Sequence, residues 1–400
     1  MNAPLRTPGP GEQRVAHDMV GTDERRARLA WAVVLEIGQE RASHDPPALC
    51  RSIREHGHVG AWHRLVAGEL RGADGARARV LQTDVDAELS RVERVGARVV
   101  VPGDDEWPDG LADERVEPHV LYLRGTGHLR HVADRAVGVV GSRASTGYGE
   151  AVARDLGAGL SSRGWGVVSG AAFGIDAAAH LGALAVGGPG VAVLACGPDQ
   201  VYPQAHRRLV DEIAQTGVVV TEQPVGRVAR RHRFLTRNRL IAALSRCVVV
   251  VEAGPRSGSL NTAGWAEALG RPVGAVPGPV TSMASAGCHE RISRGEAHLV
   301  TDAEDVLRLA APIGDPDLLA REDVGALGPA RDADVLTQHQ RQVYDVLAPR
   351  RESSVGHIAA ELALSVTEVL TQLAALQLEG FAAQGESGWV RLHPAGSPHR

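Results

Sequence analysis

Residues Val137–Arg143 read VGVVGSR, an uninterrupted apolar run that ends in glycine, serine and arginine. Five similar runs follow it along the chain: WGVVSG from Trp165, VAVLACG from Val191, VVVTE from Val218, VVVVEA from Val248 and VGAVPG from Val273. Continuous apolar runs, rather than alternating ones, are typical of strands that are buried on both faces of a sheet. Helical segments separate the six runs, which predicts an α/β fold with a Rossmann-like, doubly wound and mostly parallel sheet.

The regions on either side of these runs differ from them in composition. The first residues are rich in Pro and Gly, whereas Glu24 to about Val92 carries apolar residues at helical spacing. The segment that begins at Ala311 is rich in Pro, Gly and Asp, which is typical of a linker. In chain order we expect a disordered start (1–20), a small helical domain (21–95), the Rossmann-like core (96–310), a linker (311–332), a winged-helix domain (333–392) and a disordered tail (393–400).

The last of these domains is expected to hold three helices followed by a hairpin. Ser365-Val-Thr-Glu368 is a capping box that opens the third helix. DNA-binding folds of this kind usually read duplex DNA with a basic helix. Here the third helix, Ser365–Glu379, contains no Arg, and residues 334–392 hold four Arg against seven acidic residues. We therefore expect this domain to contact protein, or a second copy of itself, rather than DNA.

The composition excludes several kinds of chemistry. All 43 residues counted as Lys or Arg are Arg, so there is no lysine for a Schiff base, a pyridoxal-phosphate site or a Walker-type phosphate loop. The four Cys are widely spaced and form no CxxC motif, so neither a disulfide framework nor a metal site is expected. No run approaches 18 apolar residues and no signal peptide is recognisable, which predicts a cytoplasmic protein that contacts no membrane.

Charge is distributed unevenly along the chain, whose net charge is −5. No acidic residue occurs from Gln223 to Val251, and this stretch holds seven arginines. They are Arg227, Arg230, Arg231, Arg233, Arg237, Arg239 and Arg246. A basic patch on an acidic protein predicts a localised anion site, and we expect these arginines at the mouth of the sheet.

Three strand ends carry residues suited to binding phosphate. Gly141-Ser142-Arg143 follows the first run, Ser169-Gly170 follows the second, and Arg256-Ser257-Gly258 lies beyond the fifth. Helix starts of this kind aim free N–H groups at an anion, and arginine adds a bidentate fork. The first of these segments is otherwise explained as a Gly-rich turn alone. Successive phosphate sites without a nucleotide fingerprint favour a nucleic-acid strand.

Asp176 and His180 lie one helical turn apart after the second run. They are either a catalytic pair or a structural pair that orients the turn, and the structural interpretation is favoured because no nucleophile stands at a matching spacing. Tyr148 and Phe173 are aromatic residues near the strand ends, and each is either a stacking surface for bases or part of the core.

The ordered motifs VGVVGSR, SGAAFGID, AVLACGPDQVYP, FLTRNRLIAALS and VVEAGPRSGSLNTA resemble those of the DNA-processing protein A (DprA/Smf) family over about residues 98–302. The resemblance implies a cytoplasmic homodimer that binds and protects single-stranded DNA. It also implies loading of the RecA recombinase in natural transformation and DNA recombination, without catalytic activity, cofactor or metal. Arg256 replaces a frequent Lys of the family, Ala243 a frequent Gly and Cys288 a frequent Asn.

The resemblance also implies a set of DNA-binding residues. They are Gly141, Ser142, Arg143, Ser169, Gly170, Gly174, Arg237, Asn238 and Arg239, with Arg256, Ser257 and Gly258 at the rim. Arg237 and Arg239 are two residues apart on one helix, so we expect one to face the site and the other to pack against the sheet.

The alternative from another class is a Rossmann-like nucleotide phosphoribohydrolase. Asp176, Glu222 or Glu252 would then be the acid–base residue, although the chain lacks the PGGxGT-type loop of those enzymes. A dehydrogenase is disfavoured because no GxGxxG follows any of the six runs.

Overall fold

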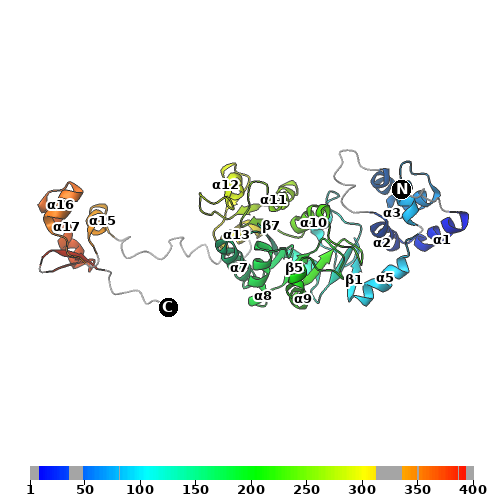
Figure 1. The fold of residues 1–400 in the computed structure, drawn as a ribbon, viewed down its shortest axis with the longest axis horizontal. Helices are drawn as coiled ribbons and strands as arrows, with labels where there is room; N and C mark the ends of the chain where they lie inside the picture. Colours follow the sequence, from blue (N-terminus) through cyan, green and yellow to red (C-terminus); the bar gives the residue numbers. More distant parts are fainter. Residues whose placement is uncertain are drawn as a thin grey trace. The chain divides into compact units, whose positions relative to one another are not determined.

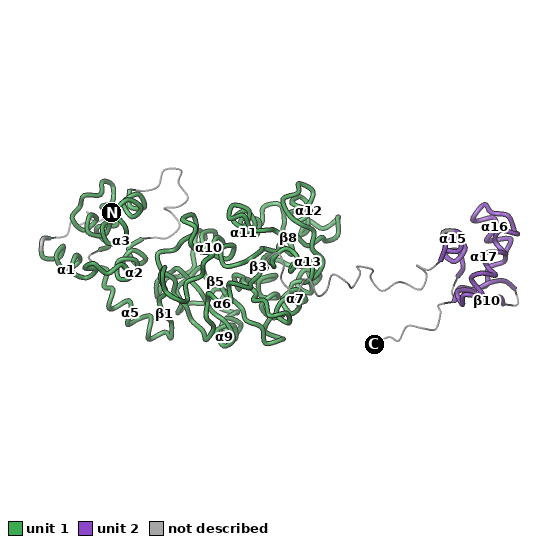
Figure 2. Tube along the Cα trace, turned by 180° about the vertical axis from the view of Figure 1, so that it is seen from behind, with its two compact units in different colours: residues 1–318 green, residues 319–400 purple. Residues whose placement is uncertain are grey.

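The computed structural model describes residues 9–35, 48–80, 82–311, 336–348, 351–385 and 387–392. They belong to two compact units, residues 1–318 and 319–400, which Figure 2 shows in different colours. Residues 312–332 of the expected linker and the expected tail, 393–400, lie outside the described residues.

The first unit begins with a helical region. Its helices are α1 (Pro10–Val20), α2 (Glu24–Val34), α3 (Ala48–Ala67), α4 (Asp74–Val80) and α5 (Val85–Arg94). The prediction of disorder over 1–20 is wrong for residues 9–20, and residues 1–8 lie outside the described residues. Burial explains the order: Ala16 and Val20 pack in the core, and the Trp62 indole donates to the Ala16 carbonyl at 2.9 Å.

The core of this helical region continues onto the sheet. Trp31 and Trp62 meet edge to face at 5.7 Å, and Val99 and Tyr122 of the first two strands belong to the same apolar cluster. The expected boundary at residue 95 therefore falls within one compact unit.

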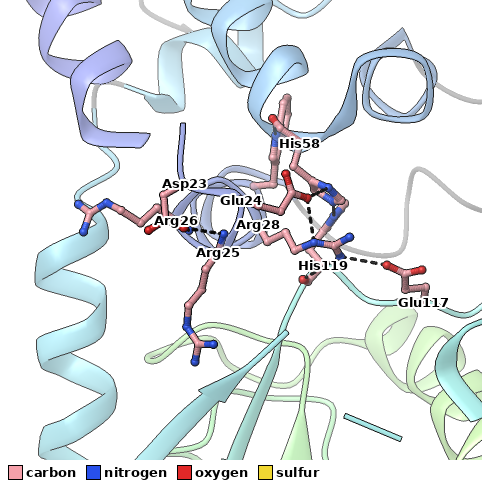
Figure 3. Close-up of polar contacts among 9 residues, drawn as sticks. Asp23, Glu24, Arg25, Arg26, Arg28, His58, Glu117 and His119 are labelled. Carbon is pink, nitrogen blue, oxygen red and sulfur yellow. Dashed lines mark hydrogen bonds and ion pairs between the residues drawn. The ribbon is translucent and has the colours of Figure 1, made fainter. Parts of the chain in front are cut away.

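A polar network joins α2 and α3 to the segment before the second strand (Figure 3). Arg28 bonds both Glu24 and Glu117 at 3.0 Å. His58 contacts Glu24 at 2.8 Å and the His119 ring at 3.0 Å. Burial and the neighbouring Arg28 lower the pKa of His58 to about 3, so its ring is neutral at neutral pH.

The first unit contains a nine-stranded sheet. Its strands are β1 (Ala97–Val100), β2 (Leu121–Arg124), β3 (Ala136–Val140), β4 (Gly166–Ser169), β5 (Gly190–Val193), β6 (Val218–Thr221), β7 (Cys247–Val250), β8 (Val273–Ala275) and β9 (His298–Leu299). Their order is β1-β2-β6-β5-β4-β3-β7-β8-β9. The β1–β2 and β2–β6 pairs are antiparallel and all the others are parallel. The six apolar runs are β3 to β8, which confirms the predicted doubly wound sheet.

Helices cover both faces of this sheet (Figure 1). One face packs on α7 (Gly147–Ser161), α8 (Ile175–Ala185), α9 (Arg207–Thr216) and α13 (Ala303–Ala310). The other packs on α6 (Leu129–Asp134), α10 (Arg231–Ala243), α11 (Gly258–Ala268) and α12 (Ala286–Ser293). Alternate residues of β3 enter the two cores, with Val137 and Val139 on one side and Ala136 and Val140 on the other. This double burial is why the strand sequences are continuously apolar.

The strand order places a topological switch point between β3 and β7. From β3 the chain moves outward through β4 and β5 to β6, and then returns to place β7 on the other side of β3. In such sheets ligands bind beyond the carboxyl ends of the strands at this point. The edge formed by the carboxyl ends of β3 to β7 is called the carboxyl edge below.

The second unit holds α15 (Gln338–Val346), α16 (Val355–Leu362), α17 (Val366–Leu378) and a hairpin of β10 (Ala382–Gln384) and β11 (Trp389–Arg391). Its apolar core includes Val343, Ile358, Leu373 and Leu376. The predicted capping box is present, with the Ser365 hydroxyl accepting from the Glu368 N–H at 3.2 Å. These elements follow the predicted order, and the winged-helix assignment stays a prediction.

Three large apolar side chains of α17 are open to solvent among polar ones. Val366, Leu370 and Leu378 are exposed, Leu378 by 90%. In the described part of the chain no single helix is long and apolar enough to span a membrane. α16 and α17 pass that test of length and composition only when taken together, across a bend of 111°.

All four cysteines are free thiols. Cys196, Cys247 and Cys288 are buried, and burial raises their pKa values to about 11, about 12 and about 11. Each of these three belongs to a different apolar cluster of the first unit.

Candidate nucleic-acid interface

The loop between β3 and α7 is held in place from β7. The Glu252 carboxylate accepts from the Thr146 N–H at 2.9 Å and from its hydroxyl at 2.6 Å, and Glu252 is buried. Thr146 in turn caps α7 by accepting from the Gly149 N–H at 3.2 Å. The two strands of the switch point therefore fix the loop that carries Ser142 and Arg143.

Two of the predicted glycines permit close packing beside this loop. A Cβ on Gly141 would lie 2.6 Å from the Ile175 side chain. Gly174 has a φ of +77°, and a Cβ there would collide with the Ser142 carbonyl. That carbonyl accepts from the Ile175 N–H at 3.3 Å. The loops after β3 and β4 thus meet backbone to backbone, and Arg143 remains exposed above them.

Ser169 and Gly170 do not present free donors. The Ser169 hydroxyl is fully buried and donates to the Val139 carbonyl at 2.6 Å. The N–H groups of Gly170 and Ala172 donate to the Asp176 carboxylate at 3.2 and 3.4 Å. We correct the expectation of a phosphate nest here, because the protein's own carboxylate already occupies it.

Arg237 is buried directly beneath this turn. Its guanidinium donates to the Val193 carbonyl and lies where a Cβ on Gly170 would be. Burial lowers the pKa of Arg237 to about 10 despite the opposing attraction of Asp176, so it stays charged at neutral pH. Burial raises the pKa of Asp176, while Arg237 opposes that rise. The two groups lie together in the buried layer beneath the carboxyl edge.

Arg239 makes a buried ion pair. Its guanidinium forms a bidentate contact with Glu222 at 2.8 and 2.5 Å, and the two side chains are 1% and 3% exposed. The expectation that one of Arg237 and Arg239 faces the site is therefore wrong, since both are buried.

The acid-free stretch does not lie together at the carboxyl edge. Arg246 precedes β7 and donates to the Asp134 carbonyl at 2.8 Å, at the opposite, amino edge of the sheet. Arg227 donates to Val33 of the helical region at 3.0 Å. Arg230 and Arg231, at the start of α10, are the members of the stretch that are exposed on the carboxyl side. The prediction of seven arginines at the mouth of the sheet is wrong for these reasons.

The remaining predicted residues join α10 to α11. The Asn238 amide donates to the Gly258 carbonyl and to the Asn261 side chain, each at 3.3 Å. Ser257 caps α11, and its hydroxyl contacts that of Ser259 at 2.7 Å. Arg256 is exposed beside this cap.

Aromatic rings complete the carboxyl edge. The Arg143 guanidinium lies over the Phe234 ring at 4.7 Å, which is a cation–π contact. Tyr202 meets Phe234 at 5.5 Å, and Phe173 meets His206 at 4.7 Å. Phe173 was expected from the sequence as a candidate stacking surface, whereas Tyr202, His206 and Phe234 were not predicted at this site. The signal for Tyr202 was its place beyond β5, whereas the Arg143–Phe234 contact joins residues far apart in sequence.

The sequence of this core matches one known family. The family model described as DNA recombination-mediator protein A matches residues 98–311. The putative DNA processing protein DprA of Mycobacterium tuberculosis is 45% identical over 385 residues, covering 92% of this chain and 95% of that protein.

The chain belongs to the DNA recombination-mediator protein A family.

Two more comparisons agree with this assignment to the DprA family. Protein Smf of Escherichia coli is 37% identical over 307 residues, which are 74% of this chain and 78% of that protein. The crystal structure of DNA processing protein A from Streptococcus pneumoniae superposes with a TM-score of 0.56 at 32% identity. The superposed residues are 76% of this chain and 98% of the Streptococcus pneumoniae chain.

Within the DprA core Asp176 and His180 are both buried. The Asp176 carboxylate is bound to backbone N–H groups of its own turn. His180 is fully buried, and burial lowers its pKa to about 4. The structural interpretation of the two residues is the one that this geometry supports. In the described residues no group of three His, Cys, Asp or Glu side chains is placed to hold a metal ion.

Proposed function

We propose that this chain binds single-stranded DNA along its carboxyl edge and mediates recombination. The observation that carries the proposal is Arg143, which is exposed at the switch point and held in place by the Phe234 ring. An arginine fixed in this way is prepared to contact a phosphate, because less side-chain freedom is lost on binding.

Other groups at this edge support phosphate binding. The first turn of α11 starts at the end of β7, and its N–H groups lie at the positive end of the helix dipole. Arg256 is exposed beside this helix start, and Arg230 and Arg231 are exposed at the start of α10. Cationic groups that follow several strand ends suit an extended backbone more than a single nucleotide.

The aromatic rings favour a single strand over a duplex. Phe173 and Tyr202 are 50% and 53% exposed at the same edge. Rings of this kind bind unpaired bases by stacking, whereas the bases of a duplex are already stacked on one another.

We further propose that the chain has no catalytic activity of its own and needs no cofactor. The three acid–base candidates of a phosphoribohydrolase are all committed to partners within the protein. Asp176 accepts backbone N–H groups, Glu222 pairs with Arg239, and Glu252 holds Thr146. Incubation with nucleoside monophosphates is expected to release no free base.

The family description supports a role as a recombination mediator. We propose that the chain acts in the cytoplasm as a homodimer that protects single-stranded DNA and loads the RecA recombinase in DNA uptake and recombination. The second unit is proposed to be a winged-helix domain that contacts protein rather than DNA, because α17 contains no basic residue and exposes Val366, Leu370 and Leu378.

The experiment that tests this function is a titration of single-stranded and duplex oligonucleotides across salt. We expect tighter binding of the single strand and a logarithmic salt slope of roughly 0.7 per phosphate contacted. Undetectable binding of the single strand at low salt would overturn the proposal. The same titration with residues 333–400 alone is expected to show no DNA binding at moderate salt.

A further inference from the structure

Exposed aromatic rings are confined to one place in this chain. The sequence contains 6 Trp, 4 Tyr and 3 Phe, all of them among the described residues. The exposed ones are Tyr148, Phe173 and Tyr202, and each lies at the carboxyl edge. Large aromatic side chains usually bury most of their surface, so their exposure at a single edge calls for a ligand with flat apolar faces.

Phe173 is held from one side and open on the other. Its ring meets the His206 ring at 4.7 Å with an interplanar angle of 69°. His206 is itself fixed, because its Nδ1 contacts the Ala171 carbonyl at 2.9 Å. The Phe173 ring is nevertheless half exposed. It therefore has a defined orientation together with an accessible surface.

Tyr202 has a similar support. Its ring meets Phe234 at 5.5 Å and 61°, and the Arg143 guanidinium covers Phe234 at 4.7 Å. Phe234 thus supports both Tyr202 and Arg143, and its own ring is only partly exposed. Tyr202, in contrast, leaves half of its surface open.

We infer that Phe173 and Tyr202 are two base-stacking positions of the single-strand site, separate from the phosphate contact made by Arg143. The inference rests on the proposed function and adds the substrate chemistry: the site binds bases as well as the backbone. Ring faces accept any base, so the two positions raise affinity for a strand without selecting a sequence. Arg143 and Tyr202 both contact the Phe234 ring. A cation that can bind phosphate therefore lies next to a ring on which a base can stack.

The test compares an ordinary oligonucleotide with an abasic strand of the same length. The two strands carry the same phosphates, and only the first carries bases. The full-length protein is expected to bind the ordinary strand more tightly, with equal salt slopes for the two strands. Equal affinity for both strands would overturn the stacking inference and leave the proposed function standing. Binding of neither strand would overturn the proposed function itself.

Variants assign the difference to the two rings. Phe173→Leu and Tyr202→Leu are each expected to weaken binding of the ordinary strand by at least about fivefold, with abasic-strand affinity unchanged. Phe173→Trp keeps a flat ring and is expected to retain the preference for the ordinary strand over the abasic strand. Leu235→Ala is the control, because Leu235 is exposed beside Phe234 and offers no ring.

Two further measurements distinguish a loss of stacking from a loss of folding. The quenching of 2-aminopurine placed in the strand reports stacking directly, and each variant is first checked for an unchanged thermal unfolding transition. A folded Phe173→Leu protein that loses the same factor for both strands, or that quenches 2-aminopurine as the parent does, would contradict the assignment of Phe173.

Discussion

α10 and α17 are both thirteen residues long, yet α10 buries three of its four arginines and α17 exposes three of its apolar side chains. Arg233, Arg237 and Arg239 of α10 are all buried. On α17, Leu370 and Leu378 are exposed, and the helix contains no basic residue. The comparison teaches that charge counted along the chain does not locate a binding surface, because burial decides which arginines meet a ligand.

The burial of arginines on α10 has a physical cause. Strand ends, turns and buried carboxylates beneath the carboxyl edge leave oxygen atoms that require donors. Arg237 satisfies the Val193 carbonyl, and Arg239 neutralises Glu222. Five N–H donors in one planar group suit this task, so these arginines support the site from below.

The largest effect is expected when the buried pair on α10 is broken. Arg239→Ala leaves the Glu222 carboxylate unpaired in the interior, and we expect the free energy of unfolding to fall by about 3–5 kcal/mol. Urea denaturation of the first unit measures it. Arg231→Ala, which removes an exposed arginine from the same helix, is expected to change stability by less than about 0.5 kcal/mol. Similar losses for the two variants would end the distinction between supporting and exposed arginines.

The two faces of α17 provide the next test. Leu373 is fully buried, so Leu373→Ala is expected to destabilise the second unit by about 2–5 kcal/mol. Leu370→Ala, on the exposed face, is expected to cost less than about 0.5 kcal/mol. Hydrogen exchange across α17 in the full chain measures both. A comparable cost for Leu370→Ala would mean that a partner covers the outer face in solution.

The stability of the buried polar groups can also be tested by lowering the pH, because His180 is buried near Arg237 of α10. Its folded pKa of about 4 lies below its ordinary value of 6.5, so the folded state binds fewer protons between these values. The contribution of neutral His180 to the free energy of unfolding is therefore fully present above pH 6.5. It falls as the pH drops towards 4, by about 2 kcal/mol at pH 5. His180→Leu is expected to remove this share of the loss in urea titrations at pH 7.5 and pH 5. A pH dependence as steep as that of the parent would contradict a neutral, buried imidazole.

The smallest effect concerns two exposed arginines at opposite edges of the sheet. Arg143→Ala is expected to weaken single-strand binding to all sequences and to lower the logarithmic salt slope by roughly 0.7. Arg246→Ala removes the same charge from the amino edge and is expected to leave both quantities unchanged. Fluorescence anisotropy across salt measures them. Equal effects of the two variants would show that net charge, and not the carboxyl edge, binds the strand.

The six central strands were predictable because burial on both faces leaves a local trace, a continuous apolar run such as that before Gly141. The capping box at Ser365 was predictable for the same reason, since its four residues are neighbours in the chain. α1 was missed because proline and glycine were taken as signs of disorder, although they are also common at the two ends of helices. Its order depends on Trp62, which lies far along the chain.

The content of the candidate site was less predictable than its position. Motifs placed Arg143, Arg237 and Arg239 near one edge, and the structure agrees with that placement. Which of them is exposed depends on long-range contacts with Phe234, Val193 and Glu222. No spacing along the sequence records such contacts.

The three buried cysteines give this molecule an internal set of reporters. A thiol whose pKa is about 11 or 12 holds almost no thiolate at pH 8, so an alkylating reagent reaches it only when the surrounding structure opens. Cys196, Cys247 and Cys288 lie in three different apolar clusters. Their separate labelling rates, resolved by mass spectrometry, would show which cluster of the core opens first, and whether bound DNA slows the opening of one cluster or of all three.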